Sequence, residues 1–514
     1  MIEMPELALG VLLPELVLAL GAIAILLLQG RGPSRAVAVA GGPGSVAGGA
    51  GAGKATVSGA GSGARTQGGN APWVAALLVT GLAGVAMAFG GTSAQPVGAG
   101  MLVIDGFTQF IRGVVLLAVG SVLLMSQDYA RRFRLDSGEF YALILFSGLG
   151  ALLMAAADDL LVVFLGLEVH SIALYVLAGY RRDLPAEESC LKYLLLGAFA
   201  SAFLLYGIAL LYGATSTTNL HDLAMVLRLQ EERGLLLYAG MGLLVVGLGF
   251  KIAAVPFHMW TPDVYEGAPT VITAFMAVVP KAGAIAALLR VFEIGLLPLA
   301  GEWQSLWAAL AILTMTVGNV LAIVQRSLKR LLAYSSIAHA GYLLVGLAAG
   351  DALGASGILF YLVAYALMNL GAFAVVAIFE RGGRGVDIDD YAGLAAERPL
   401  LAAALVLFMF SLAGVPPTAG FMGKFYLFGA AVQADMTGLA IIALLNSVIG
   451  VAYYLRVVVA VVLKPPDLGW TRGARATPAP VTAVLAAALG TLQMGLFPGL
   501  VYRLAAAGAR ALHG

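Results

Sequence analysis

Long apolar segments separated by short polar ones extend along almost the whole chain. A helix that crosses a membrane needs about 20 mostly apolar residues, and by this criterion the pattern predicts about fourteen transmembrane helices. They fall at 7–28, 72–92, 107–125, 139–157, 159–180, 189–213, 235–257, 270–292, 303–325, 329–350, 353–380, 399–430, 437–463 and 478–503. The expected fold is therefore an all-α polytopic membrane protein.

Two of these segments contain residues that interrupt a helix. The seventh has Pro256 shortly after Lys251, and the twelfth has a Gly/Pro cluster before Lys424, made of Gly414, Pro416, Pro417 and Gly420. Proline removes a backbone hydrogen bond, and the freed carbonyls are tolerated only away from lipid. Because the breaks lie five spans apart, we expect two inverted five-helix repeats, at 139–292 and 303–463, with an ion site at the breaks.

The remaining parts of the chain are an N-terminal region, 1–138, and a C-terminal helix within 464–514. The N-terminal region has three predicted helices and a Gly/Ala/Ser-rich segment at 30–70, which we interpret as a flexible cytoplasmic loop. The first span has Glu3 and Glu6 before it and lacks a basic start, so we do not interpret it as a cleaved signal peptide. Lysines and arginines concentrate in the loops after odd-numbered spans, which predicts that both termini lie outside the cytoplasm.

Composition supports the membrane class and excludes several kinds of site. Hydrophobic residues make up 61% of the chain and charged residues only 11%, against about 25% charged in soluble proteins. The net charge of +1 says nothing about partners. With Cys190 as the one cysteine, an internal disulfide and a cysteine-rich metal or iron–sulfur site are excluded. Since no Gly-rich phosphate loop follows a strand pattern, we expect no nucleotide, nucleic acid, metal or other cofactor in this chain.

Four charged residues fall in the middle of predicted transmembrane helices: Glu168, Lys251, Lys281 and Lys424. Each charge costs at least ~2.5–3.5 kcal/mol at a bilayer centre, and such residues typically line ion or proton paths. Desolvation favours the neutral form of a lysine, whereas a nearby carboxylate favours the charged form. A Glu168–Lys251 pair that opens and closes would therefore move a proton on and off Lys251. We expect Lys281 and Lys424 to act as further relay residues.

Three more residues are weaker candidates for the relay. Lys192 lies near one end of its span, where a side chain that reaches out to the membrane surface is the alternative interpretation. His258 follows Lys251 by seven residues, and His339 lies among serines and tyrosines in YSSIAHAGYLLVG. The titration range of histidine suits proton transfer. For Lys281 the alternative is also a side chain that reaches out to one membrane surface. For Glu168 and the histidines it is a buried ion pair or polar group that only packs the bundle.

Three segments resemble a known family. They are FKIAAVPFHMWTPDVYEGAPTVITAF before Lys281, SLAGVPPTAGFMGKFYLF around Lys424, and KRLLAYSSIAHAGYLLVG around His339. They resemble the antiporter-like membrane subunits of respiratory complex I and of related cation/proton antiporter complexes. The resemblance extends over spans 4 to 13. Lys424 in the second broken helix, the TPDVYEGAPT wording and the chain end soon after the last span favour the N-type branch.

The resemblance implies a function that composition alone does not reveal. It implies a proton-translocating membrane-arm subunit of NADH-quinone oxidoreductase in the bacterial plasma membrane, with Glu168 and Lys251 as a pair, Lys281 as the connecting lysine and Lys424 as the exit lysine. FMN, iron–sulfur clusters and quinone are then expected in other subunits, and the partners are other antiporter-like and small membrane subunits. The alternatives are a subunit of a Na⁺(K⁺)/H⁺ antiporter, a complex with another electron donor, and a non-pumping structural subunit.

Overall fold

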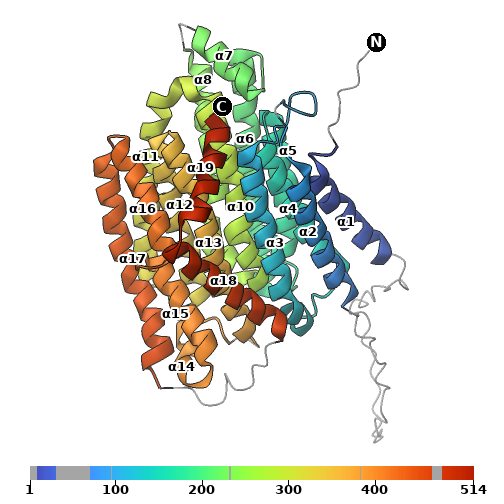
Figure 1. Ribbon diagram of the computed structural model, residues 1–514, viewed down its shortest axis with the longest axis vertical. Coiled ribbons are helices and arrows are strands. Elements are labelled where there is room, and N and C mark those ends of the chain that lie inside the picture. Colours follow the sequence, from blue (N-terminus) through green and yellow to red (C-terminus); the bar gives the residue numbers. More distant parts are fainter. Residues whose placement is uncertain are drawn as a thin grey trace, which may run out of the picture.

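A computed structural model describes residues 9–29, 70–93, 95–230, 233–381, 384–465 and 477–513 (Figure 1). The Gly/Ala/Ser-rich segment predicted as a flexible loop lies almost wholly outside these residues. The α-helices are α1 (Leu13–Gln29), α2 (Ala71–Gly90), α3 (Gly106–Arg132), α4 (Gly138–Ala156), α5 (Leu160–Ala178), α6 (Leu184–Thr215), α7 (Leu220–Leu229), α8 (Leu235–Ile252), α9 (Trp260–Gly267), α10 (Thr270–Arg290), α11 (Ala300–Ile323), α12 (Leu328–Ala349), α13 (Ala352–Phe379), α14 (Leu394–Glu397), α15 (Pro399–Ala413), α16 (Ala419–Gln433), α17 (Thr437–Leu463), α18 (Pro478–Leu496) and α19 (Gly499–His513).

The predicted all-α membrane fold is confirmed. Within the described ranges, twelve helices are long and apolar enough to cross a membrane, and α1 and α15 are shorter apolar helices. No named β-strand occurs there, and strand pairing is limited to isolated bridges. The helices run roughly along the long axis of the molecule, with α10, α12 and α13 between the two flanks of the bundle (Figure 1).

The central helices form the buried part of the bundle. In the most apolar 18-residue stretch of each helix, 100% of the residues are buried in α10, 94% in α12 and 89% in α13, but only 17% in α2. Because α10 and α12 carry Lys281 and His339, these polar side chains lie inside the protein and away from lipid. A charged group at this depth is therefore surrounded by protein groups that can accept its hydrogen bonds.

Both predicted helix breaks are present. α8 ends at Ile252 and α9 begins at Trp260, while α15 ends at Ala413 and α16 begins at Ala419. At each break one residue takes a left-handed backbone conformation, Ala253 with φ +63° and Gly414 with φ +87°. Three long helices separate the first break from the start of α4, and three separate the second break from the start of α11, when α8 and α15 are counted with the breaks themselves.

Two features of the chain differ from the sequence prediction. The last span was expected to be a single helix to residue 503, but α18 ends at Leu496 and a second helix, α19, begins at Gly499. Pro498 separates them, because proline has no amide hydrogen with which to continue the α18 ladder. α19 packs against α3 and α13. The second feature is α7, a short amphipathic helix between α6 and α8 that was not predicted.

Candidate functional site

Lys251 lies in the last turn of α8, directly before the first break. Its side chain is buried, with 3% of the residue exposed. The Nζ donates to Ser171 Oγ on α5 at 2.7 Å and to the Tyr193 hydroxyl on α6 at 3.2 Å. Both acceptors are neutral, so Lys251 can lose a proton without leaving a buried carboxylate unpaired.

Glu168 lies one helical turn before Ser171 on α5 and is only half-buried. It interacts electrostatically with Lys251, but among the described residues the two do not form a direct ion pair. One of its carboxylate oxygens is buried and has no hydrogen-bond partner in the part of the chain that the structure describes. The arrangement corresponds to an open Glu–Lys pair, with Ser171 as the group that Lys251 contacts.

Lys281 follows Pro280 in the fully buried helix α10 and is 2% exposed. Its Nζ donates to the backbone carbonyl of Ser336 and, at 2.5 Å, to the Ser336 hydroxyl on α12. The hydroxyl of Tyr365 donates to the same Ser336 oxygen at 2.7 Å. Lys281 is therefore joined across the bundle to α12 and α13 through hydroxyl groups.

His339 lies three residues beyond Ser336 on α12 and is fully enclosed. Its Nδ1 lies 2.5 Å from the Tyr361 hydroxyl, and its Nε2 lies 3.0 Å from the Tyr454 hydroxyl. The next tyrosine on α12, Tyr342, has its ring 4.8 Å from Nζ of Lys424. α12 thus carries a polar face that extends from the partner of Lys281 to the partner of Lys424.

Lys424 lies on α16 just beyond the second break and is 5% exposed. Its Nζ donates to the carbonyls of Leu412 and Ala413 at 3.0 and 3.1 Å and to Ser447 Oγ on α17 at 2.8 Å. The two carbonyls end α15, where the helix dipole favours a cation. A cavity of about 390 Å³ between α16 and α17 reaches Lys424 and Ser447.

Two of the weaker candidates lie apart from these lysines. The Lys192 side chain is 39% exposed and pairs with Glu188 at 2.6 Å and with Asp263 at 2.7 Å. His258 is partly exposed in the irregular segment between α8 and α9. Neither residue contacts Lys251, Lys281 or Lys424 in the hydrogen bonds of the described chain.

Comparison with known proteins gives the family. Residues 157–450 match the family model described as NADH:quinone oxidoreductase/Mrp antiporter, TM. The chain is 48% identical over 443 residues to NADH-quinone oxidoreductase subunit N of Trichlorobacter lovleyi, which covers 85% of this chain and 90% of that protein. The chain belongs to the subunit N family of NADH-quinone oxidoreductases. Subunit N of Salinibacter ruber is also 48% identical, over 75% of this chain and 78% of its own length.

Solved structures have the same fold, and one of them belongs to a respiratory complex I. A chain of respiratory complex I from Thermus thermophilus with bound aureothin superimposes with a TM-score of 0.77 at 35% identity, over 96% of this chain and 99% of that chain. A chain of the Mrp complex from Dietzia sp. has a TM-score of 0.79 at 20% identity, which shows likeness of fold alone. The segment matched by the family model includes Glu168, Lys251, Lys281 and Lys424.

The sequence did not predict which hydroxyl groups accept hydrogen bonds from the buried lysines of this chain. Ser171, Ser336 and Ser447 each accept a hydrogen bond from one buried lysine. Ser171 could have been found from the sequence, because it lies one helical turn from Glu168, whereas no feature of the sequence points to Ser447. His170 is two residues from Glu168, so the two side chains leave α5 in different directions. His170 is fully buried beside Ser147 and interacts electrostatically with Lys251.

Proposed function

We propose that this chain is the N-type, proton-translocating subunit in the membrane arm of a bacterial NADH-quinone oxidoreductase. The observation that carries the proposal is the set of partners around Lys251, Lys281 and Lys424. In the described residues these lysines bind hydroxyls, carbonyls and aromatic faces and form no ion pair with a carboxylate. A lysine that only packs the bundle would need a carboxylate to offset its buried charge.

The proposed path follows the buried polar groups along the bundle. Glu168 and Ser171 adjoin Lys251, and Ser336 adjoins Lys281. Beyond Ser336, the hydroxyl-bound His339 and the polar face of α12 lead towards Lys424. Each lysine takes up a proton as an N–H bond forms on Nζ and releases it as that bond breaks. Water and hydroxyl groups carry the proton between lysines, since none of the hydrogen bonds of these lysines in the described residues joins one lysine to the next.

The chain's own part of the reaction is proton transfer, and electron transfer belongs to other subunits. NADH oxidation and quinone reduction need FMN, iron–sulfur clusters and a quinone site, which we assign to the partners of this chain. The redox energy arrives through neighbouring antiporter-like and small membrane subunits. His339 remains a proposed relay residue, because it lies on the polar face of α12 between the partners of Lys281 and Lys424. Lys192 and His258 lie apart from the buried lysines, and we propose only a minor part for them in the relay.

We further propose the internal organisation and orientation of the chain. Residues 139–292 and 303–463 form two inverted repeats, each with one broken helix, and the chain is a multi-pass protein of the bacterial inner membrane. Arg132 at the end of α3 and Arg181 after α5 both bind Glu380 at the end of α13, so the links after these three helices lie at one end of the bundle. Because basic residues lie in these links, we propose that this end faces the cytoplasm and that both termini lie outside.

The test is a mild-detergent purification of the native complex through a C-terminal tag on this chain. The expected result is a large assembly with inhibitor-sensitive NADH-driven quinone reduction. A tagged assembly without redox activity or bound iron–sulfur clusters would contradict the proposal and favour the cation/proton antiporter. In that case, deletion of the gene should impair growth under sodium stress.

A further inference from the structure

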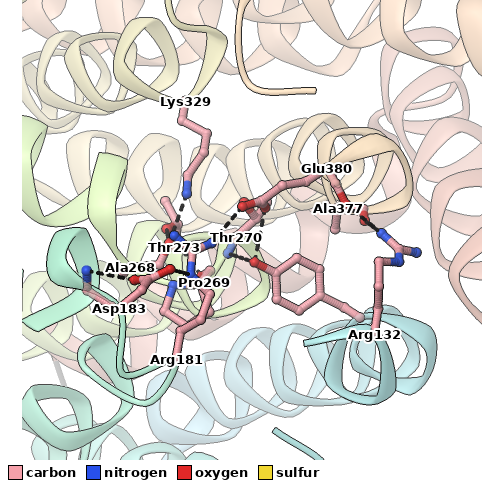
Figure 2. Close-up of polar contacts among 12 residues, drawn as sticks. Arg132, Arg181, Asp183, Ala268, Pro269, Thr270, Thr273, Lys329, Ala377 and Glu380 are labelled. Carbon is pink, nitrogen blue, oxygen red and sulfur yellow. Dashed lines mark hydrogen bonds and ion pairs between the residues drawn. The ribbon is translucent and has the colours of Figure 1, made fainter. Parts of the chain in front are cut away.

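Lys329 is a further buried lysine that the proposed path does not use. It lies in the first turn of α12 and is 1% exposed. Its Nζ donates to the backbone carbonyl of Ala268, between α9 and α10, at 2.8 Å (Figure 2). In the described parts of the chain this is its one hydrogen bond, and no carboxylate forms an ion pair with it. The bonding resembles that of Lys281, a lysine enclosed by protein and held by neutral acceptors.

The nearby carboxylate of Glu380 is already satisfied by other groups. Arg181 donates to it at 2.8 Å, and Thr270 donates to it through a short hydrogen bond (Figure 2). The Tyr129 hydroxyl also donates to it, at 3.0 Å. Burial by itself raises the pKa of Glu380, but the neighbouring Lys329, the Thr270 hydrogen bond and Arg181 outweigh it, so this pKa lies below its ordinary value. Since the guanidinium of Arg181 pairs with Glu380, the carboxylate keeps a cationic partner when Lys329 becomes neutral.

The position of Lys329 on α12 points towards Lys281. Lys329 and Ser336 are seven residues apart, which puts them on one face of the helix and about 10 Å apart along its axis. Polar atoms lie between them, because the Thr273 hydroxyl contacts the Ala268 carbonyl that Lys329 binds. The same hydroxyl donates to the carbonyl of Tyr265 at 2.9 Å.

The other end of this polar connection reaches Ser336, the acceptor of Lys281. The side chain of Tyr265 interacts with Ser336 as well as with the Met276 carbonyl. On the loop side, the half-buried Glu266 accepts a hydrogen bond from Ser327 at 2.7 Å and interacts electrostatically with Lys329. The other charged groups that act on Lys329 are Glu380, Arg181 and Asp183.

We propose that Lys329 is an additional proton-binding residue, which carries protons between the loop end of α12 and Lys281. The proposal rests on the proton-translocating function proposed above. A proton from water near Glu266 forms an N–H bond on the neutral amine of Lys329. That bond then breaks, and the proton moves through water and the hydroxyls of Thr273 and Tyr265 to form an N–H bond on neutral Lys281. The number of protons is conserved at each step.

The test compares Lys329→Arg with Lys329→Met in the complete complex in inside-out membrane vesicles. Arginine keeps the charge and can donate to the Ala268 carbonyl, but it does not release a proton in proteins. We expect both variants to assemble and both to lower the protons pumped per NADH oxidised to the level of Lys281→Met. Lys464→Met is the matched control, because Lys464 lies on the exposed end of α17 in a surface ion pair with Asp389.

If Lys329→Arg pumps normally, the proposal is wrong, and the positive charge of Lys329 has only a structural role. Failure of both variants to assemble would have the same meaning. The variant Lys251→Met in the same vesicles separates this proposal from the proposed function. If Lys251→Met abolishes the contribution of this subunit to the protons pumped per NADH, while both Lys329 variants pump normally, only the role proposed for Lys329 is wrong. If Lys251→Met also pumps normally, the proton-translocating function fails.

Discussion

The second helix break should be intolerant of even one added methyl group at Gly420. A Cβ atom on this residue would lie 1.8 Å from the backbone oxygen of Ser411. Real Cβ contacts stay above about 3 Å, so α16 has to move from α15 by roughly 1 Å, and overpacking of this kind typically costs about 1–3 kcal/mol. Lys424 binds the carbonyls of Leu412 and Ala413 at 3.0 and 3.1 Å. A shift of roughly 1 Å takes both contacts beyond the range of a hydrogen bond.

The functional consequence of Gly420→Ala follows from those lost contacts. A hydrogen bond to a charged group contributes about 1.5–3 kcal/mol, so the loss of both destabilises the ammonium form of Lys424 by at least ~3 kcal/mol. We expect the variant to pump as few protons per NADH as Lys424→Met, which lacks the ammonium altogether. Protons pumped and NADH oxidised are measured together in inside-out vesicles, with complex abundance from native gels.

The control for this prediction is Gly429→Ala on the same helix. A Cβ atom on Gly429 meets no atom of the described residues within 4 Å, so the added methyl group fits without movement. Alanine also favours a helix over glycine by about 1 kcal/mol, and Gly429→Ala should match the wild type. Normal assembly and pumping by Gly420→Ala would refute the reasoning, since α15 and α16 could then separate without disturbing Lys424.

Three other substitutions test separate parts of the account. Lys281→Met should assemble and pump fewer protons per NADH, because Ser336 loses its proton-carrying partner; unchanged pumping in vesicles would remove Lys281 from the path. Lys192→Gln should lower pumping by less than about twofold in the same assay, since its partly exposed ion pairs are worth only about 0–1 kcal/mol; a loss as large as that of Lys281→Met would show a relay role. Arg112→Met should destabilise the subunit by about 3–5 kcal/mol, because it leaves a buried charge on Glu15, with which Arg112 pairs at 2.7 Å. Thermal inactivation of the purified complex measures this effect, and the double variant with Glu15→Leu should regain stability if the pairing argument is right.

The sequence predicted the helical class and both breaks because these depend on local properties. Runs of apolar residues define the spans, and Pro256 and Pro417 lie in the two breaks, where proline cannot continue the backbone hydrogen bonds of a helix. Pro280, by contrast, is accommodated inside α10. The same local rule was not applied to Pro498, so the last span was wrongly predicted as one helix. The contact of α19 with α3 and α13 depends on packing between distant segments and has no local signal.

The charged residues of the candidate site could be predicted from the sequence, but their hydrogen-bond partners could not. Lys251, Lys281 and Lys424 are conspicuous because a charge within an apolar helix is costly. Their acceptors on other helices, such as Ser447, depend on which helix faces meet in the folded bundle. The predicted partner of Lys251 was Glu168, whereas the structure brings Ser171 into contact with it.

Lys329 was missed for a different physical reason. A lysine at the start of a transmembrane helix matches the ordinary pattern of positive charge beside the membrane, where its side chain reaches water. The structure instead buries it beneath the α9–α10 junction, next to Glu380. Only the packing of α12 against α9 distinguishes these two situations, and the sequence carries no sign of that contact.

The central claim is that buried lysines in this chain carry the protons that NADH oxidation drives across the membrane. The most direct test is the ratio of protons pumped to NADH oxidised in inside-out vesicles that contain the complete complex with Lys251→Met. We predict normal complex abundance and a lower ratio than in wild-type vesicles. A normal ratio in a fully assembled complex would contradict the claim and leave the buried lysines with a structural role only.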